Sequence, residues 1–143
     1  MIEWKLNKGR KPLILNGARQ VGKTYVLQEF AKQEFSKYVY VSLDRNEKAK
    51  KILESEASVQ SIILTLSALT GIDITPNETL IIIDEIQESP KALNVLKFFC
   101  EDAPEYPIVV AGSLLGISLH EQVSFLVGKV DLIKMYLMSF NEF

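Results

Sequence analysis

The segment 17–24 carries the residues of this chain with the clearest chemical meaning. It reads Gly-Ala-Arg-Gln-Val-Gly-Lys-Thr and fills every fixed position of the pattern G-x-x-x-x-G-K-[ST]. The apolar segment before it, residues 12–16, predicts a short buried strand, and the segment after it predicts a helix. In such a unit, successive backbone N–H groups and the positive end of the helix dipole point at one anion. The segment therefore predicts a loop that binds the phosphates of a nucleoside triphosphate.

Each fixed position in this pattern has a separate task. Gly17 and Gly22 permit backbone angles that a Cβ would penalise. Lys23 supplies a mobile charge to the β- and γ-phosphates, and the Thr24 hydroxyl is placed to ligate Mg²⁺. The side chains of Arg19 and Gln20 either contact phosphate or a partner, or are solvated loop side chains. The residues expected to bind the nucleotide are Gly17, Ala18, Arg19, Gln20, Val21, Gly22, Lys23, Thr24 and Tyr25.

Two carboxylates form a second candidate group about 60 residues further along. Asp84 and Glu85 follow the continuously apolar run 80–83, which predicts a strand buried on both faces. Ligands of open α/β sheets bind at the carboxyl ends of the strands, so both acids are expected beside the phosphate loop. Asp84 is suited to hold Mg²⁺ with Thr24, and Glu85 to accept a proton from, or orient, the attacking water. An ordinary acidic turn is the alternative interpretation.

Ser113 is a third candidate, because it follows the apolar strand expected at 108–111. If that strand lies between the other two, the Ser113 hydroxyl could contact the γ-phosphate or the attacking water. The alternative is that Ser113 caps a helix and has no catalytic part.

Strands and helices alternate along the rest of the chain. Apolar spacing predicts a helix over 22–35, a strand over 38–43, a charged helix over 47–56 and a helix between a Ser58 cap and Gly71. Ser89 and Pro90 predict an N-cap and first helical position, with Leu93, Leu96 and Phe99 facing inward. A fifth strand is expected within 130–136. Five strands alternating with helices indicate an α/β fold with a mostly parallel sheet.

Composition limits the classes of partner. The 143 residues carry 16 basic and 18 acidic side chains, a formal net charge of −2, so attraction to nucleic acid is not indicated. The single cysteine excludes an internal disulfide and is compatible with a reducing compartment. No leader-like or membrane-spanning apolar stretch is present in this sequence, so we expect a cytoplasmic protein with no membrane contact.

Taken together, the motifs resemble those of the prokaryotic AAA-like ATPases with an archaeal-type ATPase core. The resemblance rests on the phosphate loop and on Leu-Ile-Ile-Ile-Asp-Glu-Ile-Gln-Glu-Ser-Pro at 80–90. It also includes Ala-Gly-Ser-Leu-Leu-Gly at 111–116, Ser-Phe-Leu-Val-Gly-Lys-Val at 124–130 and Met-Ser-Phe-Asn-Glu-Phe at 138–143. It covers nearly the whole chain.

The resemblance implies a three-layer, additional-strand P-loop fold whose five-stranded sheet has the order 5-1-4-3-2. That order puts Ser113 between the phosphate loop and Asp84. The resemblance also implies ATP as the nucleotide and agrees with Lys23, Thr24, Asp84 and Glu85 as the functional set. Similar proteins typically continue into a C-terminal domain of unassigned activity, so residues 1–143 are expected to be one ATPase core truncated at the C-terminus.

The expected function is Mg-dependent ATP binding and hydrolysis, coupled to a missing domain or a protein partner. Glu85 beside the magnesium aspartate favours hydrolysis, with Lys23 and Ser113 also assigned to catalysis. Two alternatives stay open: a small-molecule P-loop kinase, and a nucleotide-dependent switch or interaction module that does not hydrolyse ATP. The oligomeric state is left open.

Overall fold

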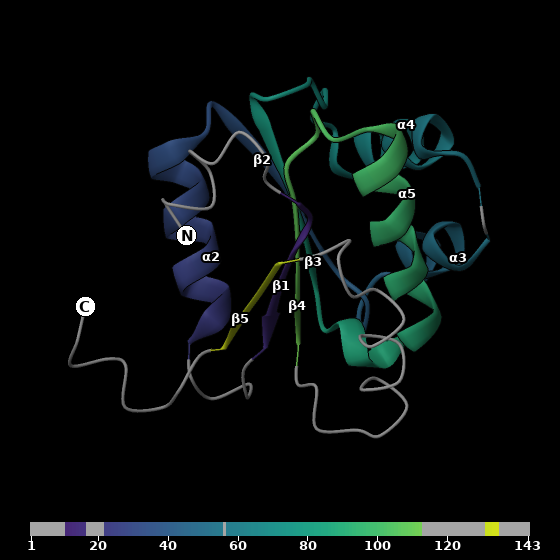
Figure 1. Cartoon of the computed structure of the whole chain (residues 1–143), viewed down its shortest axis with the longest axis horizontal. Helices are drawn as coiled ribbons and strands as arrows, with labels where there is room; N and C mark the ends of the chain where they lie inside the picture. Colours follow the sequence, from purple (N-terminus) through teal and green to yellow (C-terminus); the bar gives the residue numbers. More distant parts are fainter. Residues whose placement is uncertain (1–10, 17–21, 56, 113–130, 135–143) are drawn as a thin grey trace.

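The computed structural model describes residues 11–16, 22–55, 57–112 and 131–134 as a β-sheet between two helical layers (Figure 1). The strands are β1 (Leu13–Asn16), β2 (Lys37–Ser42), β3 (Thr79–Asp84), β4 (Ile108–Gly112) and β5 (Asp131–Lys134). The α-helices are α2 (Lys23–Glu34), α3 (Glu47–Glu54), α4 (Val59–Thr70) and α5 (Val95–Asp102), and two short 3₁₀-helices are η2 (Ile86–Glu88) and η3 (Pro90–Asn94).

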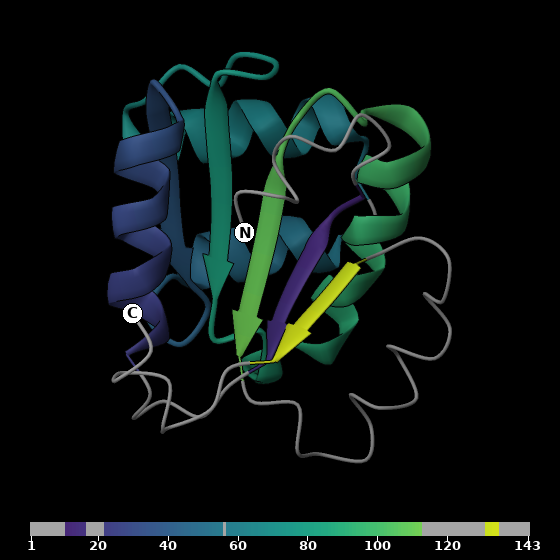
Figure 2. The same ribbon diagram turned by 60° about the vertical axis from the view of Figure 1, so that its left-hand side comes forward.

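The described strands form one sheet in the order β2-β3-β4-β1-β5, and every pairing is parallel. The expectation of a parallel α/β sheet is confirmed. Read from β5, the order is the one that the resemblance implied. Strand β4 is inserted between β1 and β3, as Figure 2 shows, with Asn16 beside Gly112 and Ile83 beside Val110. The carboxyl ends of these three strands therefore meet at one edge.

Two apolar cores fix the three layers. Helix α2 covers one face of the sheet, where Leu27 and Phe30 pack with Leu80 and Ile82 of β3. Helices α3, α4 and α5 cover the other face, where the alternate β3 residue Ile81 belongs to the larger core. The run that was expected to be covered on both faces is fully buried throughout. A parallel sheet with helices on both faces needs strands that are apolar on both faces, because each face is covered and excludes water.

Local signals set several helix ends. The side chains of Asn46 and Ser58 accept backbone hydrogen bonds at the starts of α3 and α4, from Ala49 and Ser61. Gly71 ends α4 in the left-handed conformation, with φ 73°, which a glycine adopts without steric cost. The Ser58 and Gly71 predictions are thus confirmed, whereas the helix expected over 47–56 ends at Glu54.

Ser89 occupies the N-cap position and Pro90 is the first helical residue, as the sequence predicted. The segment begins as the 3₁₀-helix η3 before continuing as α5, and the Ser89 side chain makes no capping hydrogen bond. The buried Ser89 hydroxyl instead donates to a carboxylate oxygen of Glu54, at the end of α3. The half-buried Glu54 carboxylate thus provides the Ser89 hydroxyl with a partner other than the local backbone. Leu93, Leu96 and Phe99 are buried as expected.

Candidate functional site

The candidate site lies at the carboxyl edge of the sheet. Strand β1 leads toward α2, strand β3 ends at Asp84, and β4 ends at Gly112 between them. Gly22 precedes α2 with φ 76°, so the left-handed conformation expected for this glycine is present. Helix α2 starts with no side-chain cap and no acidic residue in its first turn. Its first amides and its dipole therefore favour an anion at this end.

Thr24 and Asp84 come together across 60 residues of sequence. The Thr24 hydroxyl Oγ1 donates to Asp84 Oδ2 at 2.7 Å. The other carboxylate oxygen, Oδ1, accepts the backbone N–H of Glu85 at 2.8 Å. Asp84 is only 1% exposed, so the direction of its carboxylate is set by these bonds rather than by bulk water. The two residues predicted to share a metal thus lie within hydrogen-bond distance.

Tyr40 on β2 is a third residue at this carboxylate. Its hydroxyl donates to the same Asp84 oxygen, Oδ2, that receives the Thr24 hydroxyl. Burial raises the pKa of the Tyr40 phenol from 10.0 to about 12, and the contact with Asp84 adds to the rise. The phenol therefore keeps its donor hydrogen throughout the neutral range.

Sequence reasoning missed Tyr40, because it lies in no nucleotide motif and reads as an ordinary strand aromatic. The signal was the register. Ser42 pairs with Asp84 across β2 and β3, so Tyr40, two residues earlier, faces the same side as Ser42. A tyrosine two positions earlier on a neighbouring strand is long enough to reach the carboxylate. This contact can be predicted only when the strand order and register are known.

Glu85 occupies an unusual backbone position. It has φ 57° and ψ 46°, the left-handed region that non-glycine residues enter at a cost, and it is 8% exposed. The side-chain amide Nε2 of Gln87 donates to its carboxylate oxygen Oε2. The two successive carboxylates thus have different side-chain donors. Hydroxyl groups donate to Asp84, and the Gln87 amide donates to Glu85.

Two other candidate residues, Lys23 and Tyr25, lie in the first turn of α2. Tyr25 is 69% exposed on the first turn of α2, and Lys23 is the first residue of that helix. The candidates Gly17, Ala18, Arg19, Gln20, Val21 and Ser113 lie outside the described residues. The condition set for Ser113 is met, since the strand that precedes it lies between β1 and β3.

The oxygen atoms at this edge suit a hard divalent cation. A hydroxyl and a carboxylate are ligands that Mg²⁺ takes, and it commonly completes its shell with phosphate oxygens and water. Within the described ranges no group of three or more His, Cys, Asp or Glu side chains could hold a metal. Thr24 and Asp84 could therefore hold Mg²⁺ together with a nucleotide, rather than as a cage made by the protein alone.

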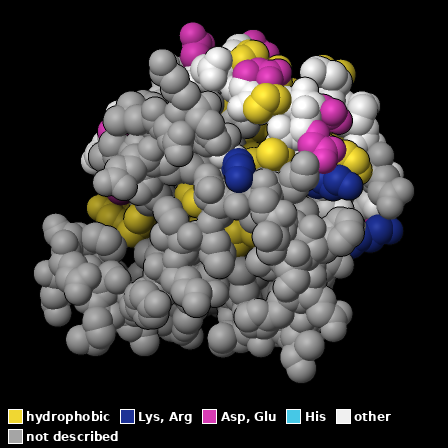
Figure 3. All heavy atoms as spheres, in the orientation of Figure 1, with side chains coloured by type: hydrophobic (Ala, Val, Ile, Leu, Met, Phe, Trp, Pro, Cys, Tyr) yellow, Lys and Arg dark blue, Asp and Glu magenta, His cyan; other side chains and the backbone are white. Residues whose placement is uncertain are grey.

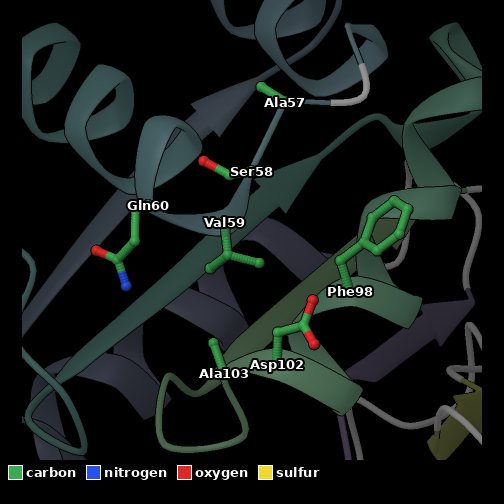
Figure 4. A pocket seen from close by; sticks show the side chains of 7 residues that line it. All are labelled: Ala57, Ser58, Val59, Gln60, Phe98, Asp102 and Ala103. Atoms are coloured by element: carbon green, nitrogen blue, oxygen red, sulfur yellow. The ribbon is translucent and has the colours of Figure 1, made fainter.

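A hollow in the described part of the chain lies apart from this edge. This hollow, of about 480 Å³, lies between the start of α4 and the end of α5, and Figure 4 shows Val59, Phe98 and Asp102 among its lining. No candidate residue lines it. On the face in Figure 3, the described acidic side chains lie mainly toward the top and the described basic side chains lie below them. No described helix combines the length and the apolar character needed to cross a bilayer.

Comparison with known proteins agrees with this geometry. A family model described as AAA domain matches residues 9–143, which include the phosphate-loop segment, β3 with its two carboxylates, and β4. The search of curated proteins gave no match.

Proposed function

The chain belongs to the AAA domain family, and from this premise we propose that it binds Mg-ATP and hydrolyses it. The observation that carries the proposal is the 2.7 Å contact between Thr24 Oγ1 and Asp84 Oδ2. It joins the end of the phosphate-loop motif to the carboxyl end of β3, at the edge where parallel α/β sheets bind ligands. An accidental match to the loop motif would not require this partner.

The residues divide the work as follows. The first amides of α2 and the Lys23 ammonium bind the phosphates, and Thr24 with Asp84 would hold Mg²⁺. The bound cation would neutralise charge on the phosphate oxygens. Glu85 orients the attacking water and accepts its proton. Ser113, following β4, is proposed to contact the γ-phosphate or the water.

Glu85 favours hydrolysis over transfer to a substrate hydroxyl. Its carboxylate follows the metal-binding aspartate directly and is held by the Gln87 amide, so it is kept at the same edge of the sheet. A base beside the metal site is needed most when water is the nucleophile. The proposal therefore ranks an ATPase above the kinase alternative.

We further propose that this core is of the additional-strand, archaeal type and passes its nucleotide state to another domain or protein. The arginines of the sequence are Arg10, Arg19 and Arg45, and Arg45 is exposed in the turn after β2. An arginine supplied by a partner can be worth ~10³–10⁵ in rate. Turnover by the chain alone is accordingly expected to be slow and to rise when the partner is present.

Thermal unfolding with and without Mg-ATP tests the proposal. ATP at about 100 times its dissociation constant should add roughly 2.7 kcal/mol to the stability of the parent chain. Lys23→Ala should lose this gain, because the phosphates lose their main cationic contact. Lys32→Ala is the matched control, since Lys32 lies in the last turn of the same helix with an exposed side chain. A parent chain that gains no stability from Mg-ATP would exclude the proposed function.

A further inference from the structure

Three of the donors at the Asp84 carboxylate are Thr24, Glu85 and Tyr40, and of these Tyr40 alone lies outside the nucleotide motifs. The Glu85 N–H binds Oδ1, while the hydroxyls of Thr24 and Tyr40 both bind Oδ2. These donors come from three elements: the turn after β3, the first turn of α2, and the edge strand β2. The carboxylate is therefore held at both of its oxygens, and the Tyr40 hydroxyl provides a bond from β2.

Tyr40 is built to hold its partner in place. Its side chain is half-buried and packs against the apolar core under α2, and it has only two rotatable side-chain bonds, so the hydroxyl is held on a rigid ring. Residues that hydrogen-bond a metal ligand fix its orientation, and their loss commonly weakens metal affinity 10- to 100-fold. The Tyr40 phenol makes such a hydrogen bond, because it donates to Oδ2 of Asp84, a carboxylate that would hold Mg²⁺.

We infer that Tyr40 is a positioning residue for Asp84, through which the edge strand β2 sets the affinity of the nucleotide site for Mg²⁺. This inference rests on the proposed function. Removing the phenolic oxygen takes away the donor that β2 provides at Oδ2, and the Asp84 carboxylate can then turn away from the direction that the cation needs. The nucleotide contacts proposed for the phosphate loop do not include Tyr40, so nucleotide binding without Mg²⁺ should not depend on the phenol.

A matched control lies two residues earlier on the same strand. Tyr38 is also half-buried, also packs against the core under α2, and faces the same side of the sheet. Among the described residues, no hydrogen bond involves the Tyr38 hydroxyl. Tyr38→Phe removes the same atom as Tyr40→Phe, from the same strand and face, without touching Asp84.

The test is thermal unfolding of the full chain at fixed ATP while Mg²⁺ is titrated from zero. Tyr40→Phe should raise the Mg²⁺ concentration for half-maximal stabilisation by about 10- to 100-fold. Tyr38→Phe should leave it at the parent value. Stabilisation by ATP in EDTA should be the same in all three chains, and a cooperative unfolding transition without nucleotide should show that both variants fold.

Each other result has a defined meaning. If Tyr40→Phe matches the parent, or binds Mg²⁺ more tightly, the positioning role is wrong while the proposed function stands. An equal shift in Tyr38→Phe also overturns it, because the effect then does not pass through Asp84. If the parent chain does not respond to ATP with or without Mg²⁺, the proposed function fails and the inference fails with it.

Discussion

Gly112 at the end of β4 lies directly against Gln87 of η2. A Cβ built on Gly112 would stand 2.4 Å from Gln87 Oε1, 2.8 Å from Ile86 Cγ2 and 3.0 Å from the Ile86 backbone nitrogen. Gln87 in turn donates to Glu85 through its amide nitrogen. Gly112 at the end of β4 is thus packed against Gln87, the side chain that hydrogen-bonds the proposed catalytic base Glu85.

The first prediction follows from this contact. Gly112→Ala should lower the free energy of unfolding by about 1–3 kcal/mol, the usual cost of inserting a methyl group into a packed site. The flexible end of Gln87 can move, but the Ile86 backbone cannot move without displacing η2. Urea unfolding of parent and variant measures the loss.

A double variant separates the two parts of this cost. Gln87→Ala removes the nearest atom, so Gly112→Ala should cost less in that background than in the parent chain. The remaining cost reports the contact with Ile86. A Gly112→Ala variant as stable as the parent would show that position 112 accepts a side chain.

The second prediction concerns helix capping. The Asn46 side chain accepts the Ala49 N–H at 3.0 Å at the start of α3, so Asn46→Ala should cost about 1 kcal/mol. Asn94 is the matched control, because it precedes α5 without a side-chain capping bond. Denaturant unfolding of the two variants should show a clear loss for the first and little for the second. Equal losses would show that the cap bond is not the cause.

Much of the fold could be predicted because strong local signals agree with tertiary placement. The run ending at Asp84 is apolar at every position, as a strand buried on both faces requires, and Ser58 and Gly71 mark both ends of α4. The link between Thr24 and Asp84 was predictable because both belong to motifs whose positions at the sheet edge are fixed by the fold.

The contacts that could not be predicted are those made between elements by residues outside any motif. Tyr40 reaches Asp84 only because β2 pairs with β3 in one register, and Ser89 contacts Glu54 across 35 residues. Ser89 followed by proline looks like a cap from local chemistry alone. A distant carboxylate provided the alternative acceptor, and no local pattern carries that information.

The third prediction uses the raised pKa of Tyr40. The folded chain holds this phenol protonated up to about pH 12, whereas the unfolded chain releases the proton near 10.0. The contribution of the protonated Tyr40 phenol to the free energy of unfolding is therefore complete below pH 10, and it is lost as pH rises from 10 to 12. The difference in unfolding free energy between the parent and Tyr40→Phe should stay constant up to pH 10 and then move in favour of the variant.

Denaturant unfolding at several alkaline pH values measures this difference, and the other titrating groups affect both chains alike. A difference that changes between pH 7 and 9, or stays flat to pH 12, would contradict the assigned shift. A change between pH 7 and 9 would show that a group other than Tyr40 titrates. A difference that stays flat to pH 12 would show that the pKa of Tyr40 is not raised in the folded chain.

The fourth prediction separates binding from hydrolysis. Glu85→Gln keeps the size of the side chain but removes its ability to accept a proton, so ATP hydrolysis should fall by about 10²–10⁴-fold. Stabilisation by Mg-ATP should be retained, because Thr24 and Asp84 are unchanged. Glu88→Gln, an exposed acid at the end of η2, is the matched control and should keep the parent rate. Phosphate release at saturating ATP measures all three chains, and a Glu85→Gln variant that hydrolyses ATP at the parent rate would remove Glu85 from the chemistry.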